Sequence, residues 1–196
     1  MIMKNQIKKI RESIRSHDSN ERFLSLGYEP LFVADERARI VIVGQAPGIN
    51  AQELGKPWAD LSGERLISWL GIDEALFRDE SKISLLPMDF YYQGRAKSGD
   101  LPPRRGFAAL WHPKLLALMP NIKLTVLAGQ YAVKEYLGAE AKANLTETVR
   151  AYKDYLPKVF PIVHPSPLNN RWLAKNPWFL SDVIPALQKQ VKRALR

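Results

Sequence analysis

The stretch Arg39-Ile40-Val41-Ile42-Val43-Gly44-Gln45-Ala46-Pro47-Gly48 decides the fold. Its first half is a short apolar run rich in β-branched residues, which is typical of a strand buried on both faces of a parallel sheet. The run stops at Gly44, and Pro47 and Gly48 favour a turn directly after it. We therefore predict a central strand at residues 39–43 with a tight turn at its carboxyl end.

Three further segments have the composition of buried strands. They lie at residues 82–87, 123–128 and 158–163. Segments with helical periodicity separate them, and connections of this length join parallel strands. The sequence thus predicts an α/β fold, with a single three-layer α/β/α domain around a central, mostly parallel sheet of about four strands.

The N-terminal region has a helical pattern of its own. Ile7, Ile10 and Ile14 fall on one face of one or two surface helices within residues 2–26. We expect residues 1–30 to form a helical segment packed on the domain edge. The chain shows no internal repeat or linker, so residues 1–196 are predicted to form one domain, and this length suits one continuous core.

Two helices are expected in the middle of the chain. The first is capped by Asp60 or Ser62 and ends at Gly71, and the second occupies about residues 113–119. His112 comes directly before the second, so we interpret it as a helix-start or surface residue.

Two more helices follow the later strands. One lies at residues 131–137. The other is the terminal helix, for which Asn176 is the expected N-cap and Pro177 the first helical residue. Pro185 should kink or split this terminal helix.

The composition favours a polyanionic partner, with nucleic acid as the first candidate. The chain has 29 Lys plus Arg against 20 Asp plus Glu, a net charge of +9. Such charge attracts polyanions, although it can also serve solubility alone. Since no apolar run suits a bilayer and the basic N-terminus lacks the apolar segment of a secretory signal, we expect a cytoplasmic monomer outside membranes.

Cysteine is absent from the sequence. Disulfides, thiol nucleophiles, cysteine-based zinc sites and cysteine-ligated iron–sulfur clusters are therefore excluded. We expect neither a cofactor nor a metal site.

Two loops at the carboxyl ends of predicted strands carry unusual sequences. They are Gly44-Gln45-Ala46-Pro47-Gly48 and His164-Pro165-Ser166-Pro167-Leu168-Asn169. In a parallel sheet such loops converge on one cleft. Together they resemble the two signature motifs of the uracil-DNA glycosylase superfamily, and the segment at residues 55–63 resembles the one that supplies its aromatic platform. The resemblance covers residues 38–185, and the second motif is the more specific one.

The resemblance implies a catalytic role for His164. Cleaving an N-glycosidic bond leaves negative charge on the departing base, so donors aimed at a base oxygen lower the barrier. In the family the matching histidine bonds the uracil carbonyl oxygen, assisted by backbone N–H groups, here near Gln45 and Ala46. His17 has no comparable context.

Base binding is expected at Ala46, Pro47, Gly48, Trp58 and Asp89. Trp58 lies in a loop with glycine and proline, and we interpret it as the stacking surface for a flipped base; a core tryptophan is the alternative. Strict uracil enzymes of the superfamily place a bulky tyrosine where this chain has Gly48, so a roomier pocket is expected. The asparagine that reads uracil in many relatives is absent from residues 84–88.

The residue that positions water departs from the family pattern. Many relatives carry an acidic residue or asparagine in the first motif, where this chain has Gln45 and Ala46. Gln45 can orient a water molecule but cannot take its proton. Asp60 and Asp89 are the nearest carboxylates in the predicted topology. We favour Asp60 as the catalytic carboxylate, and its alternative role is the N-cap of the next helix.

The DNA-binding residues are expected at Pro165, Ser166, Pro167, Leu168, Asn169 and Arg171. The prolines stiffen the loop, and an exposed Leu168 is suited to fill the space that a flipped base leaves. Ser166 and backbone N–H groups can hold phosphates. The alternative is a leucine packed into the core, which its polar neighbours disfavour.

These features predict a DNA glycosylase-like hydrolase that resembles a cluster-free bacterial branch of the superfamily. It would flip a deaminated base, preferably uracil, and cleave its N-glycosidic bond in base excision repair. The alternative is a catalytically weak or inactive module that binds DNA or nucleotides on the same scaffold. Both would bind, and only the enzyme would leave an abasic site.

Overall fold

A four-stranded parallel sheet forms the centre of the protein. The computed structural model describes residues 2–196, and the strands are β1 (Ile40–Val43), β2 (Ile83–Leu85), β3 (Leu124–Ala128) and β4 (Val159–Ile162). Their order in the sheet is β2-β1-β3-β4, and each neighbouring pair is parallel. The predicted fold class is confirmed, and each strand lies within a segment predicted as one.

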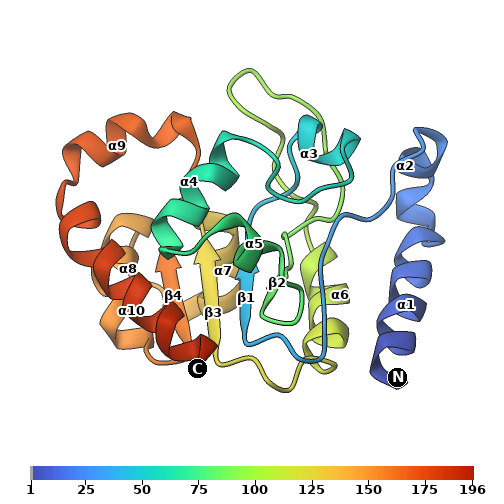
Figure 1. The fold of residues 1–196 in the computed structure, drawn as a ribbon. Coiled ribbons are helices and arrows are strands. Elements are labelled where there is room, and N and C mark those ends of the chain that lie inside the picture. The colour runs from blue at the N-terminus through green and yellow to red at the C-terminus, as the bar shows by residue number, and fades with distance from the viewer. Residues whose placement is uncertain (1) are drawn as a thin grey trace.

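Helices connect the strands and cover both faces of the sheet (Figure 1). They are α1 (Ile2–Arg15), α2 (Glu21–Ser25), α3 (Ile49–Glu53), α4 (Leu61–Leu70), α5 (Glu74–Arg78), α6 (Phe107–Leu116), α7 (Gln130–Leu137), α8 (Leu145–Arg150), α9 (Asn170–Lys175) and α10 (Ile184–Leu195). The strand arrows in Figure 1 point toward the side on which α3, α9 and the long loop between β2 and α6 lie. None of the helices within residues 2–196 combines the length and apolar character needed to cross a membrane.

Alternate residues of β1 face two separate apolar layers. Ile40 and Ile42 pack in a layer with residues of α4 and α10, whereas Val41 and Val43 pack with residues of α1, α6 and α7. All four side chains are fully buried. A strand covered on both faces needs an apolar residue at every position, which explains the continuous run that dominates this part of the sequence.

Helix α6 begins earlier than the sequence indicated. The predicted start at residue 113 was wrong, because Pro113 lies inside the helix. Phe107, Trp111 and Leu115 recur at intervals of four and are all buried. Packing of this apolar face therefore outweighs the cost of an interior proline.

His112 is buried, so its assignment to a helix start or to the surface was wrong. One ring nitrogen, Nε2, lies 3.0 Å from the carbonyl oxygen of Pro87, and Nδ1 lies 2.8 Å from the hydroxyl of Tyr136. Both ring nitrogens thus have partners inside the protein. The side chain ties α6 to α7 and to the loop that leaves β2.

The chain enters α10 through a π-helical turn at Phe179–Val183. Pro185 follows in the first turn of α10, and the wider turn is the local adjustment at the place where a kink was predicted.

The predicted side-chain cap at Asn176 was wrong. Its Nδ2 donates to the carbonyl of Trp172, and its Oδ1 accepts from the indole N–H of Trp178.

Candidate active site

A cleft of about 450 Å³ opens at the carboxyl ends of β1, β3 and β4. It brings together most of the predicted site residues, namely Gln45, Ala46, Pro47, Gly48, Trp58, Asp60, His164, Ser166, Leu168 and Asn169. These segments are far apart in sequence but meet here, because parallel strands end at the same edge of a sheet.

Gly44 allows the first loop to pass close to an aromatic ring. A Cβ at position 44 would lie 2.6 Å from Cζ2 of Trp58, nearer than two such carbon atoms can approach. The carbonyl groups of Gly44 and Gln45 accept N–H bonds from the chain after β2. The N–H groups of Gln45 and Ala46 donate to no protein group within residues 2–196, and both residues line the cleft.

Trp58 has an unusual backbone conformation. Its φ of 57° lies in the left-handed region, which residues other than glycine rarely adopt. Residues held in this conformation are often found at functional sites. Arg78 of α5 donates to the carbonyls of Pro57 and Trp58. A Cβ on Gly63 would come within 1.9 Å of the Trp58 oxygen, so only glycine admits this carbonyl. These contacts fix the backbone that carries the indole.

The imidazole of His164 stacks on this indole. The two ring centroids are 5.4 Å apart, and the planes are inclined by 25°. Burial lowers the pKa of His164 to about 4, against the opposing charge of Asp60. The ring is therefore neutral near pH 7, with one nitrogen able to donate and the other able to accept. Neither ring nitrogen bonds to a protein group in the described part of the chain, while Asn169 fixes the backbone by donating to the His164 carbonyl at 2.7 Å.

Asp60 uses its two carboxyl oxygens differently. Its Oδ1 accepts the N–H of Gly63 at 2.9 Å and thereby caps α4. Its Oδ2 lies 3.6 Å from the point that a Cβ on Gly48 would occupy, in the wall of the cleft. The capping role and a role in the cleft, which the sequence presented as alternatives, are therefore compatible.

Asp100 also lines the cleft, and reasoning from the sequence missed it. Its Oδ2 lies 3.7 Å from the same point beside Gly48. A short antiparallel bridge between Arg95 and Asp100 shapes its loop. Desolvation raises the pKa of Asp100, the charge of Asp60 raises it further, and Arg95 opposes both. The one sequence signal was the long irregular stretch between β2 and α6, a kind often kept for function.

Leu168 stands at the rim of the cleft, in a 3₁₀ turn at Pro167–Asn169. Its side chain is 69% exposed, and a Cβ on Gly99 of the opposite loop would lie 3.3 Å from one of its methyl groups. Ser166 Oγ accepts the N–H of Leu168, and Arg65 donates to the Ser166 carbonyl, each at 3.2 Å. The leucine thus projects from a turn that is tied to the body of the protein.

The sequence also matches a known family. The sequence model of the Uracil DNA glycosylase superfamily matches residues 31–188, a span that includes both loop motifs and Trp58. The chain belongs to this superfamily. A similar solved structure is the solution NMR structure of a candidate uracil DNA glycosylase from Methanosarcina acetivorans. It has a TM-score of 0.46 and 13% identity, and the match covers 81% of this chain and 94% of that one.

Asp89 does not reach the cleft of this superfamily member. It is fully buried and forms a bidentate ion pair with Arg104, with Nε to Oδ2 at 2.7 Å and Nη2 to Oδ1 at 2.8 Å. The N–H groups of Tyr91 and Arg104 donate to it as well. The carboxylate organises the loop between β2 and α6, and the structure contradicts its predicted contact with the base.

Three residues predicted for DNA binding also lie outside the cleft lining. Pro165 is buried, while Pro167 and Arg171 are exposed. Their contacts with DNA stay predictions. Within residues 2–196, no three His, Asp or Glu side chains are grouped so that they could hold a metal ion.

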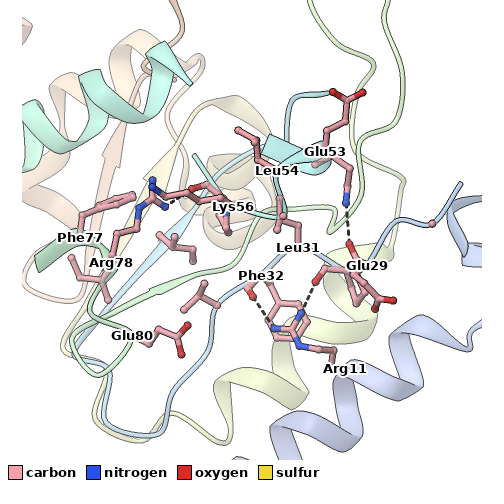
Figure 2. Close-up of a pocket in the computed structure, with 18 residues that line it drawn as sticks. Arg11, Glu29, Leu31, Phe32, Glu53, Leu54, Lys56, Phe77, Arg78 and Glu80 are labelled. Carbon is pink, nitrogen blue, oxygen red and sulfur yellow. Dashed lines mark hydrogen bonds between the residues drawn. The ribbon is translucent and has the colours of Figure 1, made fainter. Parts of the chain in front are cut away.

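A second cavity, of about 580 Å³, lies beside the candidate active site of this uracil-DNA glycosylase superfamily member (Figure 2). Arg11 and Arg78 are among its lining residues, and Figure 2 shows both guanidinium groups bonded to backbone carbonyls. Leu31 and Pro57 line both spaces. The cavity therefore backs onto the segment that carries Trp58, a relationship that the sequence did not indicate.

Proposed function

We propose that the protein is a DNA glycosylase that flips a deaminated base, preferably uracil, into the cleft and hydrolyses its N-glycosidic bond. One observation carries the proposal: a neutral His164, stacked on Trp58, shares the cleft with the carboxylate of Asp60. Membership of the superfamily supports DNA as the partner and glycosylase-like chemistry. The net charge of +9 favours contact with phosphates.

His164 acts on the departing base. As the bond between C1′ and the ring nitrogen breaks, its electron pair moves onto the base, and the carbonyl oxygens of the base gain negative charge. A neutral imidazole can donate a hydrogen bond to such an oxygen without first changing its own protonation. Gln45 and Ala46 line the same cleft, and their unbonded N–H groups supply further donors.

Asp60 positions the attacking water. Its Oδ2 accepts no protein hydrogen bond in the region that the structure covers, and it lies in the cleft wall. The water oxygen forms the new bond to C1′ while a water proton moves toward this carboxylate. Gln45, whose side-chain amide donates to the Leu101 carbonyl at 3.4 Å, can orient the water but cannot accept its proton.

Trp58 and Leu168 serve base flipping. A flipped base gains about 1–3 kcal/mol by stacking on an aromatic side chain. Leu168, exposed at the rim, fills the gap that the base leaves in the duplex. The product is an abasic site, the starting point of base excision repair.

The deciding experiment incubates the protein with oligonucleotides that carry uracil, hypoxanthine or xanthine, and then cleaves abasic sites with alkali. We expect strand cleavage with uracil at the least. DNA binding without cleavage of any of the three would favour the alternative, a binding module that keeps the scaffold and lacks turnover.

A further inference from the structure

A short hairpin, residues 94–101, lies in the loop between β2 and α6. Two backbone hydrogen bonds and one antiparallel bridge close it, namely Ala96 N–H to the Gly99 carbonyl at 3.0 Å, Leu101 N–H to the Gly94 carbonyl at 2.8 Å, and the bridge between Arg95 and Asp100. Lys97 and Ser98 therefore form its tip. The hairpin belongs to the light-green loop that extends beyond the carboxyl ends of the strands in Figure 1.

The hairpin borders the mouth of the cleft. It contributes three of the lining residues, Ser98, Gly99 and Asp100. At its base, the side-chain amide of Gln45 donates to the carbonyl of Leu101 at 3.4 Å. Near its tip, a Cβ on Gly99 would lie 3.3 Å from a methyl group of Leu168. The tip thus lies next to the leucine at the rim, where a nucleotide would enter the cleft.

The hairpin carries two cations that have no acidic partner. Arg95 and Lys97 are exposed, and neither forms an ion pair with any of residues 2–196. The one acid of the hairpin is Asp100, whose Oδ2 lies 3.7 Å from the point that a Cβ on Gly48 would occupy and so faces the cleft. The hairpin therefore presents positive charge to solvent beside the mouth of the cleft.

We propose that this hairpin is a second DNA-binding element, in which Lys97 and Arg95 bind the phosphates that flank the flipped nucleotide. The inference rests on the proposed base flipping and goes beyond it by naming what holds the backbone of the damaged strand. Flipping rotates a nucleotide about its backbone, so the base enters the cleft while the flanking phosphates stay at its mouth. Cations that border the mouth are the groups that meet these phosphates.

The hairpin and Leu168 serve different parts of the DNA. Leu168 fills a gap in the base stack, which exists only in a duplex. The hairpin binds the strand that carries the base, and that strand is also present in single-stranded DNA. Because phosphate contacts carry no sequence information, the hairpin should contribute equally to the binding of all sequences.

The salt dependence of binding tests for a phosphate contact. Each contact releases counterions, so the logarithm of the binding constant falls with the logarithm of salt concentration by about 0.9 per contact in a duplex. Lys97→Ala should therefore weaken binding about eightfold at 0.1 M salt, reduce this slope by about 0.9, and have little effect near 1 M salt. Arg95→Ala should act in the same way, and Lys97→Arg should bind as the wild type does.

Fluorescence anisotropy measures these affinities apart from cleavage. The probes are a duplex and a single strand that carry a 2′-fluorinated deoxyuridine, whose glycosidic bond resists hydrolysis. Both probes should bind more weakly to Lys97→Ala, with a reduction in slope of about 0.7 for the single strand.

A neutral linkage in the DNA locates the contact. A methylphosphonate directly 5′ or 3′ of the fluorinated uridine removes the charge of one flanking phosphate. At least one of these two substitutions should weaken binding to the wild type by a similar factor. The same substitution should lose most of its effect in the double variant Arg95→Ala, Lys97→Ala, because the cations that it would deprive of a partner are already gone.

Lys192→Ala is the matched control, since this lysine of α10 is exposed, lies outside the cleft lining and removes the same charge. Thermal unfolding establishes that each variant is folded. Equal affinity and salt slope in Lys97→Ala and Lys192→Ala would overturn the inference, and so would full methylphosphonate effects in the double variant. Base release alongside either result would leave the proposed function intact. Binding that depends on the hairpin, without release of any base, would instead refute the proposed hydrolysis and leave this inference standing.

Discussion

Trp58 and His164 lie ring to ring, with centroids 5.4 Å apart and planes inclined by 25°. The imidazole thus covers part of the indole, and the two rings form one surface in the cleft. Arg78 and Gly63 fix the backbone of Trp58, while Asn169 fixes that of His164. The proposed hydrogen-bond donor and the proposed stacking ring are therefore held in a fixed relative position, which is the condition for electrostatic preorganisation.

Replacing His164 tests its role as donor. We expect His164→Ala to lower the single-turnover cleavage rate by at least about 10²-fold, which is typical of losing a donor to developing charge. Affinity for DNA should change little, since the rim residues remain. Rates and binding are measured on the same uracil duplex, and a near-normal rate would remove His164 from catalysis.

Acid should destabilise the protein through its buried histidines. Burial lowers the pKa of His112 and of His164 from 6.5 to about 4. Between these values the unfolded chain takes up protons that the folded chain does not, so the free energy of unfolding falls as pH drops through this window. Above it, this contribution is constant.

Urea unfolding at several pH values measures this effect. His112→Gln should give a shallower fall between about pH 6.5 and pH 4, because one of the two depressed groups is gone. The variant will be less stable than the wild type at neutral pH, so the slope, not the absolute stability, is compared. Equal slopes would show that His112 is not the group responsible.

Two substitutions at Asp60 distinguish its role in stability from its proposed role in catalysis. Asp60→Asn keeps an oxygen for the Gly63 N–H and removes the charge, so stability should be retained while the cleavage rate falls. Asp60→Ala should lose in addition about 1 kcal/mol of stability with the cap. If Asp60→Asn matches the wild type in both stability and rate, the water is held elsewhere, with Gln45 as the next candidate.

Gly48 should make the pocket permissive. We expect a second damaged base, hypoxanthine or a substituted uracil, to be processed within about 10²-fold of uracil, the order of discrimination that size alone achieves. Gly48→Tyr should narrow this range by filling the space beside the base. Gly48→Ala is the control for the backbone, because its methyl group would meet Asp60 and Asp100 only at ordinary contact distances of 3.6 and 3.7 Å. No gain in selectivity with tyrosine would mean that another residue reads the base.

Leu168 should matter only in duplex DNA. Its side chain is 69% exposed, so Leu168→Ala should leave thermal stability almost unchanged. Cleavage of uracil in a duplex should slow, because the gap left by the base is no longer filled, while cleavage in single strands should not. Leu26→Ala, at a leucine that is 64% exposed and is not among the residues that line the cleft, is the control. Equal effects on both substrates would contradict the wedge role.

The sheet and the loop motifs were predictable because their sequences are locally determined. Ile40 to Val43 must all be apolar in a strand covered on both faces, and the turn that follows has glycine and proline at its ends. Asp60 or Ser62 was the expected cap of α4, and Asp60 is the residue that caps it. Where a residue's role depends on its own neighbours in sequence, the pattern was sufficient.

The remaining features depend on contacts between distant segments. Asp89 is neutralised by Arg104, and Asp100 reaches the cleft only through the path of an aperiodic loop, so no local pattern distinguished the structural acid from the one in the site. His112 was misjudged because Pro113 suggested a helix boundary, whereas burial of Trp111 and Leu115 carries the helix through it.

Gly44 and Gly63 constrain how this sequence can change over time, and they do so in different ways. A Cβ at position 44 would strike the indole of Trp58, so a larger residue there is expected to be accepted only after the tryptophan has become smaller. A Cβ at position 63 would strike the Trp58 carbonyl oxygen, an atom that every residue at position 58 retains. Gly44 can therefore be replaced only after Trp58 has been replaced by a smaller residue. Gly63 stays fixed as long as the backbone at position 58 keeps its left-handed conformation.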